Sequence, residues 1–225
     1  MDPTRTRELL IGRLVEAAHP VRRLWPPWAR LSAWLGLGLV VVGVVALGGL
    51  RSDLTARLRE PVFLIELATL LAGATLFAVL AFRAAIPGCA PRRWETVLAI
   101  GLVAAAAAIS FYRPVHAELS MAQFFHMGLG CAARTFLIAL APWCAVVMAI
   151  RRGAPLAGAA AGALSGAAAF VLAFGIMRAA CPMDELLHLV VWHGVPVLVG
   201  VAVSALVGFL WLSRWGARSS SSRSR

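Results

Sequence analysis

The sequence predicts an all-α membrane protein with six transmembrane helices and both termini in the cytoplasm. Of its 225 residues, 61% are hydrophobic and 14% are charged, and its mean hydropathy is +0.84, which is far from the composition of a soluble domain. Several apolar runs are long enough to cross a bilayer, for which a helix needs about 20 residues. The six expected spans lie at about 31–50, 61–82, 94–112, 129–150, 155–177 and 189–212.

The distribution of arginine predicts the orientation. All 21 basic residues are arginine, and six spans would place fifteen of them on the side of the two termini and five on the opposite side. Because positively charged loops are retained in the cytoplasm, both termini are expected there. The net charge of +11 is thereby explained without a nucleic-acid partner. Direct nucleic-acid binding is also disfavoured because no basic stretch alternates with aromatic residues.

Three regions are expected along the chain. They are a cytoplasmic amphipathic segment at 1–27, the transmembrane domain at 28–212, and a disordered Ser/Arg-rich tail at 213–225. In the first region, Asp2 and Pro3 are suited to begin a helix that Pro20 ends at His19. Its apolar stripe includes Leu9, Leu10, Leu14, Val15 and Ala18. The pattern leaves open a helix on the membrane surface, a helix docked into a partner, and a solvated extension.

Thiol, imidazole and carboxylate groups gather at the span ends opposite the termini. On a helix, one face would carry Cys181, Asp184, Glu185 and His188, which follow the spacing i, i+3, i+4 and i+7. Cys131, at the expected start of the fourth span, matches the depth of Cys181, whereas Cys89 and Cys144 do not. We expect Cys131 and Cys181 to form a disulfide or to share a metal site. Two independent small residues are the alternative.

The thiol, imidazole and carboxylate groups near Cys131 and Cys181 are suitable ligands for a borderline-soft divalent ion such as zinc or cadmium. The expected ligands are Cys131, Cys181, Asp184, Glu185 and His188. The alternative is a polar periplasmic helix with ordinary surface charges.

Three ionisable residues lie a few positions inside the spans at the same level, namely Glu66, Arg134 and His193. Ionisable groups inside a membrane are usually paired, so we expect a contact between Glu66 and Arg134 with His193 near it. Snorkelling of these side chains to the interface is the alternative.

Other motifs restrict the class of protein. The chain contains no P-loop, GxSxG, HExxH or CxxC motif, so we expect that it is not an enzyme. No charge lies near the middle of a span, which disfavours an ion-coupled transporter. Gly158, Gly162 and Gly166 are spaced for close helix packing, either within one chain or in a homo-oligomer. A small inner-membrane transporter or metal carrier remains the alternative function.

One series of residues runs along the whole chain in a fixed order: Ala18-His19-Pro20-Val21, Pro26-Pro27, Leu50-Arg51-Ser52-Asp53-Leu54, Pro61, Phe63, Glu66, Ile86-Pro87-Gly88, Trp94, Cys131, Cys181 and Trp192-His193. In these residues the chain resembles the NrsF-type family of bacterial membrane anti-sigma factors. The resemblance implies an inner-membrane protein that binds an extracytoplasmic-function sigma factor and releases it under heavy-metal or oxidative stress. It further implies that Cys131 and Cys181 are periplasmic sensor residues. The helix around Leu9–Ala18 becomes the expected sigma-factor contact.

Overall fold

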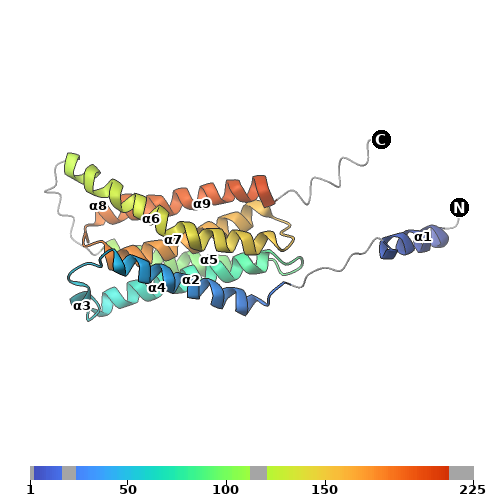
Figure 1. The fold of residues 1–225 in the computed structure, drawn as a ribbon, viewed down its shortest axis with the longest axis horizontal. Coiled ribbons are helices and arrows are strands. Elements are labelled where there is room, and N and C mark those ends of the chain that lie inside the picture. The colour runs from blue at the N-terminus through green and yellow to red at the C-terminus, as the bar shows by residue number, and fades with distance from the viewer. Residues whose placement is uncertain (1–2, 17–23, 112–120, 213–225) are drawn as a thin grey trace.

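The computed structural model describes residues 3–16, 24–111 and 121–212, and these are helical throughout, with short connections (Figure 1). Six helical segments are long and apolar enough to cross a membrane, as the sequence predicted. The elements are α1 (Pro3–Glu16), α2 (Pro27–Leu47), α3 (Leu54–Arg57), α4 (Pro61–Ala84), α5 (Arg93–Phe111), α6 (Met121–Arg151), α7 (Gly158–Ala180), α8 (Leu186–His188), the π-helix η1 (Leu189–Gly194), α9 (Val195–Val207) and the π-helix η2 (Gly208–Leu212). The sixth span runs from α8 to η2.

Proline and glycine set several of these boundaries. Pro27 and Pro61 occupy the first turns of α2 and α4, where a missing backbone N–H leaves no helical bond unmade. Gly49 and Gly88 follow the same two helices with φ values of 103° and 83°. Glycine adopts these values without the clash that a Cβ atom would cause, so both turns depend on it.

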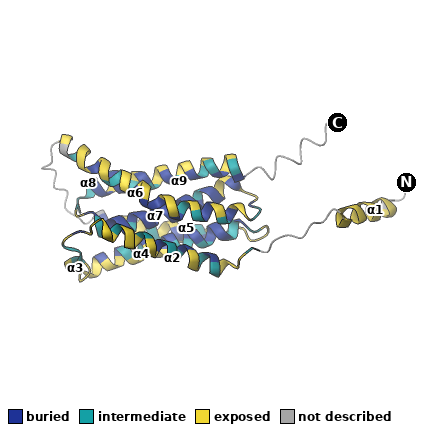
Figure 2. Cartoon of the chain, viewed as in Figure 1, coloured by how far each residue is buried: buried dark blue, intermediate teal, exposed yellow. Residues whose placement is uncertain are grey.

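Helix α7 lies at the centre of the bundle, where it packs against α4, α6 and α9 (Figure 1). Most of its side chains are buried (Figure 2). A Cβ atom added at Gly162 would collide with the backbone oxygen of Ser204, and one added at Gly208 would collide with the backbone oxygen of Gly158. The glycine spacing of the fifth span therefore allows close packing within one chain.

The outer surface of the bundle is apolar. Leu39, Leu137 and Leu198 are each about 70% exposed, and many other large apolar side chains point outward. Such a surface is expected where helices face lipid rather than water.

The predicted apolar stripe of α1 is exposed. Leu9, Leu10, Leu14 and Val15 are all more than half exposed, and every described side chain of α1 is exposed (Figure 2). The remaining predicted contact residue, Ala18, lies outside the described residues, as do the expected end of the helix at His19 and the tail at 213–225.

The bundle has two opposite ends, the Cys181 end and the Arg30 end. The Cys181 end holds α3, the end of α7 and the beginning of the sixth span. The Arg30 end holds the beginning of α2 and the end of η2 (Figure 1). The first span therefore begins on the side of the bundle where the last span ends.

Candidate metal and thiol site

Two cysteines from different helices meet at the Cys181 end. The sulfur atoms of Cys131 and Cys181 lie 3.5 Å apart, the only cysteine pair brought together in the described part of the chain. Cys181 follows the last residue of α7, and its N–H donates to the carbonyl of Met177 at 2.7 Å. Cys131 was expected at the start of its span, but α6 begins at Met121, so Cys131 lies ten residues inside the helix. The two residues nevertheless match in depth.

Two histidines complete a group of four potential ligands. One ligand atom from each of Cys131, Cys181, His188 and His193 can be chosen so that all four lie within 4.8 Å of one another. His188 Nε2 lies 3.5 Å from the sulfur of Cys181, and the two imidazole rings are 5.3 Å apart. His188 and His193 are both almost fully buried, and within the described part of the chain neither ring nitrogen of His193 makes a well-formed hydrogen bond, with the thiol of Cys181 as its polar neighbour. Unpaired buried nitrogen atoms are costly, which favours a ligand at this position.

The π-helix η1 brings the two histidines together. On a regular α-helix, residues five positions apart point about 140° away from each other, because each residue turns about 100°. In η1 the backbone instead bonds five residues back, as the N–H of Val195 does to the carbonyl of Val190. His188 and His193 then lie one wider turn apart on the same face. Pro196 follows directly and cannot donate to the carbonyl of Trp192, which favours this local widening.

The segment between Cys181 and Glu185 is not helical, contrary to the sequence expectation. Residues 181–185 have no regular structure, and helix begins only at Leu186. Helical spacing therefore does not place these four residues on one face. Asp184 and Glu185 do not belong to the group of four potential ligands. His193, which the sequence placed in a separate polar layer, takes a place in the group instead.

Asp184 is held by arginines. Its carboxylate lies 2.6 Å from Arg51, 2.8 Å from Arg57 and 2.8 Å from Arg178. Burial would raise the pKa of Asp184, but the hydrogen bond from Arg51 and the charge of Arg178 outweigh it, so the pKa lies below its usual value. Three cations thereby fix the segment after Cys181 in place.

Glu66 forms a buried ion pair with Arg178, whereas the sequence had favoured a pair with Arg134. Arg178 Nε lies 2.6 Å from Glu66 Oε1, and both side chains are completely buried. Arg134 is an exposed side chain on α6, because the inward face of that helix at this level carries Cys131 and Thr135. The fifth span was expected to end at 177, whereas α7 continues to Ala180 and buries Arg178. Of the expected polar layer, Glu66 and His193 are buried.

The thiol of Cys181 is activated by its neighbours. Its pKa is lowered by the hydrogen bond with Cys131 and by the imidazole of His188, although burial opposes this effect. The thiolate is the form that binds metal ions and reacts with oxidants, so these neighbours favour either role for the pair.

Aromatic packing joins α6 to η1 beside the site. The ring of Trp192 lies 5.4 Å from the ring of Phe124 and 5.6 Å from that of Phe125. Its indole also rests directly on Gly128, where a Cβ atom would overlap it. Any shift of η1 therefore acts directly on α6.

One family of known proteins matches the chain. The family described as "NrsF: Negative regulator of sigma F" matches residues 14–215, which include all six spans and all four ligands but only the last part of α1. No curated protein and no solved structure was found to match the chain. Since the family match covers nearly all of the sequence, the chain belongs to the NrsF family of negative regulators of sigma F.

Proposed function

We propose that this protein is an inner-membrane anti-sigma factor that senses heavy metals or oxidants outside the cytoplasm. In this proposal, Cys131 and Cys181 lie at the periplasmic side, and α1 holds an extracytoplasmic-function sigma factor at the cytoplasmic side. The observation that carries the proposal is the group formed by Cys131, Cys181, His188 and His193, which joins α6, α7 and the sixth span.

The four ligands suit a divalent ion of the zinc or cadmium type. Two thiolates and two neutral imidazoles would make a centre with no net charge, which a buried site tolerates best. Zinc bonds of about 2.0–2.3 Å place tetrahedral ligands about 3.3–3.8 Å apart. The present spread of up to 4.8 Å would therefore contract on metal binding, and the helices that carry the ligands would be drawn together.

Oxidation is the second input at the same place. With hydrogen peroxide as the two-electron oxidant, the two thiols would form one disulfide and the peroxide would be reduced to two molecules of water. The sulfur atoms need to approach from 3.5 Å to about 2.05 Å. Metal binding and disulfide formation would thus both shorten the distance between α6 and the end of α7. Both would shift the protein toward conformations in which the two helices lie closer together.

A hydrogen bond offers a route to the opposite end. Helix α6 extends from Cys131 past Pro142, whose carbonyl accepts a hydrogen bond of 3.1 Å from the indole N–H of Trp34 on α2. Through this hydrogen bond, a displacement of α6 would also move α2, the helix that follows the N-terminal segment.

The N-terminal helix is suited to bind a partner. Its exposed apolar stripe of Leu9, Leu10, Leu14 and Val15, which Ala18 would extend, resembles the face with which amphipathic helices dock into grooves. In the proposal, this stripe occupies a groove on the sigma factor and releases it when α2 shifts.

Co-purification of the sigma factor from membranes tests the sensing half. The wild-type protein is expected to retain the sigma factor until cadmium or peroxide is added. A Cys131→Ser/Cys181→Ser double variant should retain it under both conditions. The matched control is Cys89→Ser/Cys144→Ser, which changes two exposed cysteines elsewhere and should respond like the wild type. Release from the Cys131/Cys181 double variant at the wild-type level would disprove sensing at this pair.

Deletion of residues 1–20 tests the docking half separately. We expect the deletion to abolish co-purification, whereas removal of residues 216–225, which follow the family match, should not. A sigma factor that still co-purifies without residues 1–20 must be held elsewhere. A flux assay with the protein in liposomes would identify the alternative function, a transporter or metal carrier.

A further inference from the structure

A buried arginine without a partner lies at the opposite end of the bundle from the cysteines. Arg30, in the first turn of α2, is only 7% exposed. None of its three guanidinium nitrogens has a hydrogen-bond partner in the part of the chain that the structure describes. Its guanidinium carbon lies 5.2 Å from the centre of the Phe82 ring, a contact that compensates only part of the lost hydration. Such a group calls for an anion.

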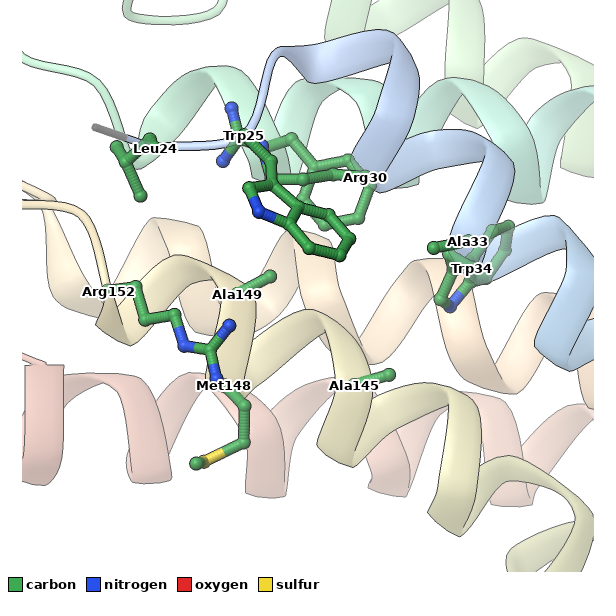
Figure 3. Close-up of a pocket in the computed structure, with 10 residues that line it drawn as sticks. Leu24, Trp25, Arg30, Ala33, Trp34, Ala145, Met148, Ala149 and Arg152 are labelled. Atoms are coloured by element: carbon green, nitrogen blue, oxygen red, sulfur yellow. The ribbon is translucent and has the colours of Figure 1, made fainter. Parts of the chain in front are cut away.

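This arginine lines a cavity of about 630 Å³ between α2 and α6. Figure 3 shows Trp25, Arg30 and Trp34 on one side of it, and Met148, Ala149 and Arg152 on the other. Among its lining residues, two are arginines and none is acidic, while most of the others are apolar. The cavity therefore combines two fixed positive charges with apolar walls.

The position of the cavity indicates where the anion comes from. It lies where α2 begins and α6 ends, next to exposed Trp25 and Trp28, and tryptophan is typical of the membrane–water interface. Phospholipid phosphates lie at this level, and basic pockets between transmembrane helices bind anionic headgroups. An acyl chain would also cover the apolar wall formed by Trp34 and Met148, which a free inorganic anion would leave exposed to water.

We propose that this cavity binds one anionic phospholipid, with its phosphate at Arg30 and its acyl chain between α2 and α6. Guanidinium groups bind phosphate through paired hydrogen bonds, and none of the guanidinium nitrogens of Arg30 is used by another described residue. Arg152 adds a second positive charge, so a headgroup that carries its own ammonium group is disfavoured. The lipid would lie between the same two helices that Trp34 and Pro142 connect, and would thus fix their spacing.

Native mass spectrometry of the detergent-purified full-length protein tests this assignment. We expect phosphatidylglycerol to bind the wild type more tightly than phosphatidylcholine. Arg30→Gln should weaken phosphatidylglycerol binding roughly 10- to 100-fold, the effect of losing a charge-assisted pair of hydrogen bonds. Arg93→Gln, which changes an exposed arginine at the beginning of α5 at the same end, should leave the affinity unchanged.

A second variant tests the cavity without changing its charge. Ala149→Phe fills the space between the helices while Arg30 stays in place, and it should also weaken phosphatidylglycerol binding. Equal binding of the two lipids, or full affinity of Arg30→Gln, would overturn the proposal. Displacement of the lipid by inorganic phosphate would instead assign the site to a free anion. These readouts do not depend on the sigma factor, so they are independent of the proposed function.

Discussion

The pair formed by Glu66 and Arg178 gives a sharp test of the structure. Both side chains are completely buried, and Arg178 also pairs with Asp184. Arg178→Met would leave two carboxylates without this cation. Removal of one member of a buried ion pair costs about 3–5 kcal/mol in the free energy of unfolding. For a chain of this length, each kcal/mol corresponds to about 2–4 °C, so the lower limit predicts a fall of about 6–12 °C in melting temperature.

Arg134 provides the matched control, because the sequence pattern had named it as the partner of Glu66. It lies on the exposed face of α6, so Arg134→Met should change stability by less than about 0.5 kcal/mol. Thermal unfolding in detergent measures both variants. A double-mutant cycle with Glu66→Gln should yield a coupling energy of at least about 1 kcal/mol with Arg178→Met and none with Arg134→Met. Equal effects of the two arginine variants would refute the assigned pairing.

Three further predictions concern the Cys181 end. The purified protein should bind one zinc or cadmium ion, and His193→Gln should lower the affinity at least about 100-fold in a chelator competition assay, while Glu185→Gln should not change it. Gly128→Ala should force the Trp192 indole away and destabilise the fold by about 1–3 kcal/mol, whereas Gly130→Ala meets open space and should be neutral in the same thermal assay. Because the pKa of Asp184 is lower in the folded protein, its carboxylate stabilises the fold above about pH 3.9, and this contribution is lost as the pH falls further. The melting temperatures of the wild type and Asp184→Asn should therefore differ at pH 7 and converge in acid, and a constant difference would contradict the assigned ion pairs.

The spans could be predicted from the sequence because each is a long apolar run, and hydropathy alone decides whether a helix enters a membrane. Their ends were less accurate. Helix α6 begins eight residues before the expected start at 129, since Met121, Phe124 and Phe125 continue the helix beyond the strictly apolar run. Helix α7 likewise extends to Ala180, which places Arg178 in the buried interior.

The cysteine pair could be inferred from depth and family resemblance, whereas the remaining ligands could not. Helical spacing favoured Asp184 and Glu185 as ligands only if a regular helix followed Cys181, and residues 181–185 are not helical. Spacing by five residues gave no reason to join His188 to His193, since only a π-helix places them on one face. Pro196 was the one visible signal of an irregular backbone at this position. The cost of an unpaired buried histidine becomes apparent only when its surroundings are known.

The arrangement of the site indicates which half moves in the proposed mechanism. Cys181 follows α7, and the segment after it is fixed by three arginines through Asp184, while the backbone N–H of Arg51 donates to the carbonyl of Ala179. His188 instead ends α8 and His193 lies in the π-helix η1, a helix type that is rare and is found mostly as single turns at functional sites. A contracting site would therefore displace η1 rather than α7. Trp192 lies in η1 against Gly128, so this displacement reaches α6, the helix that Pro142 connects to α2.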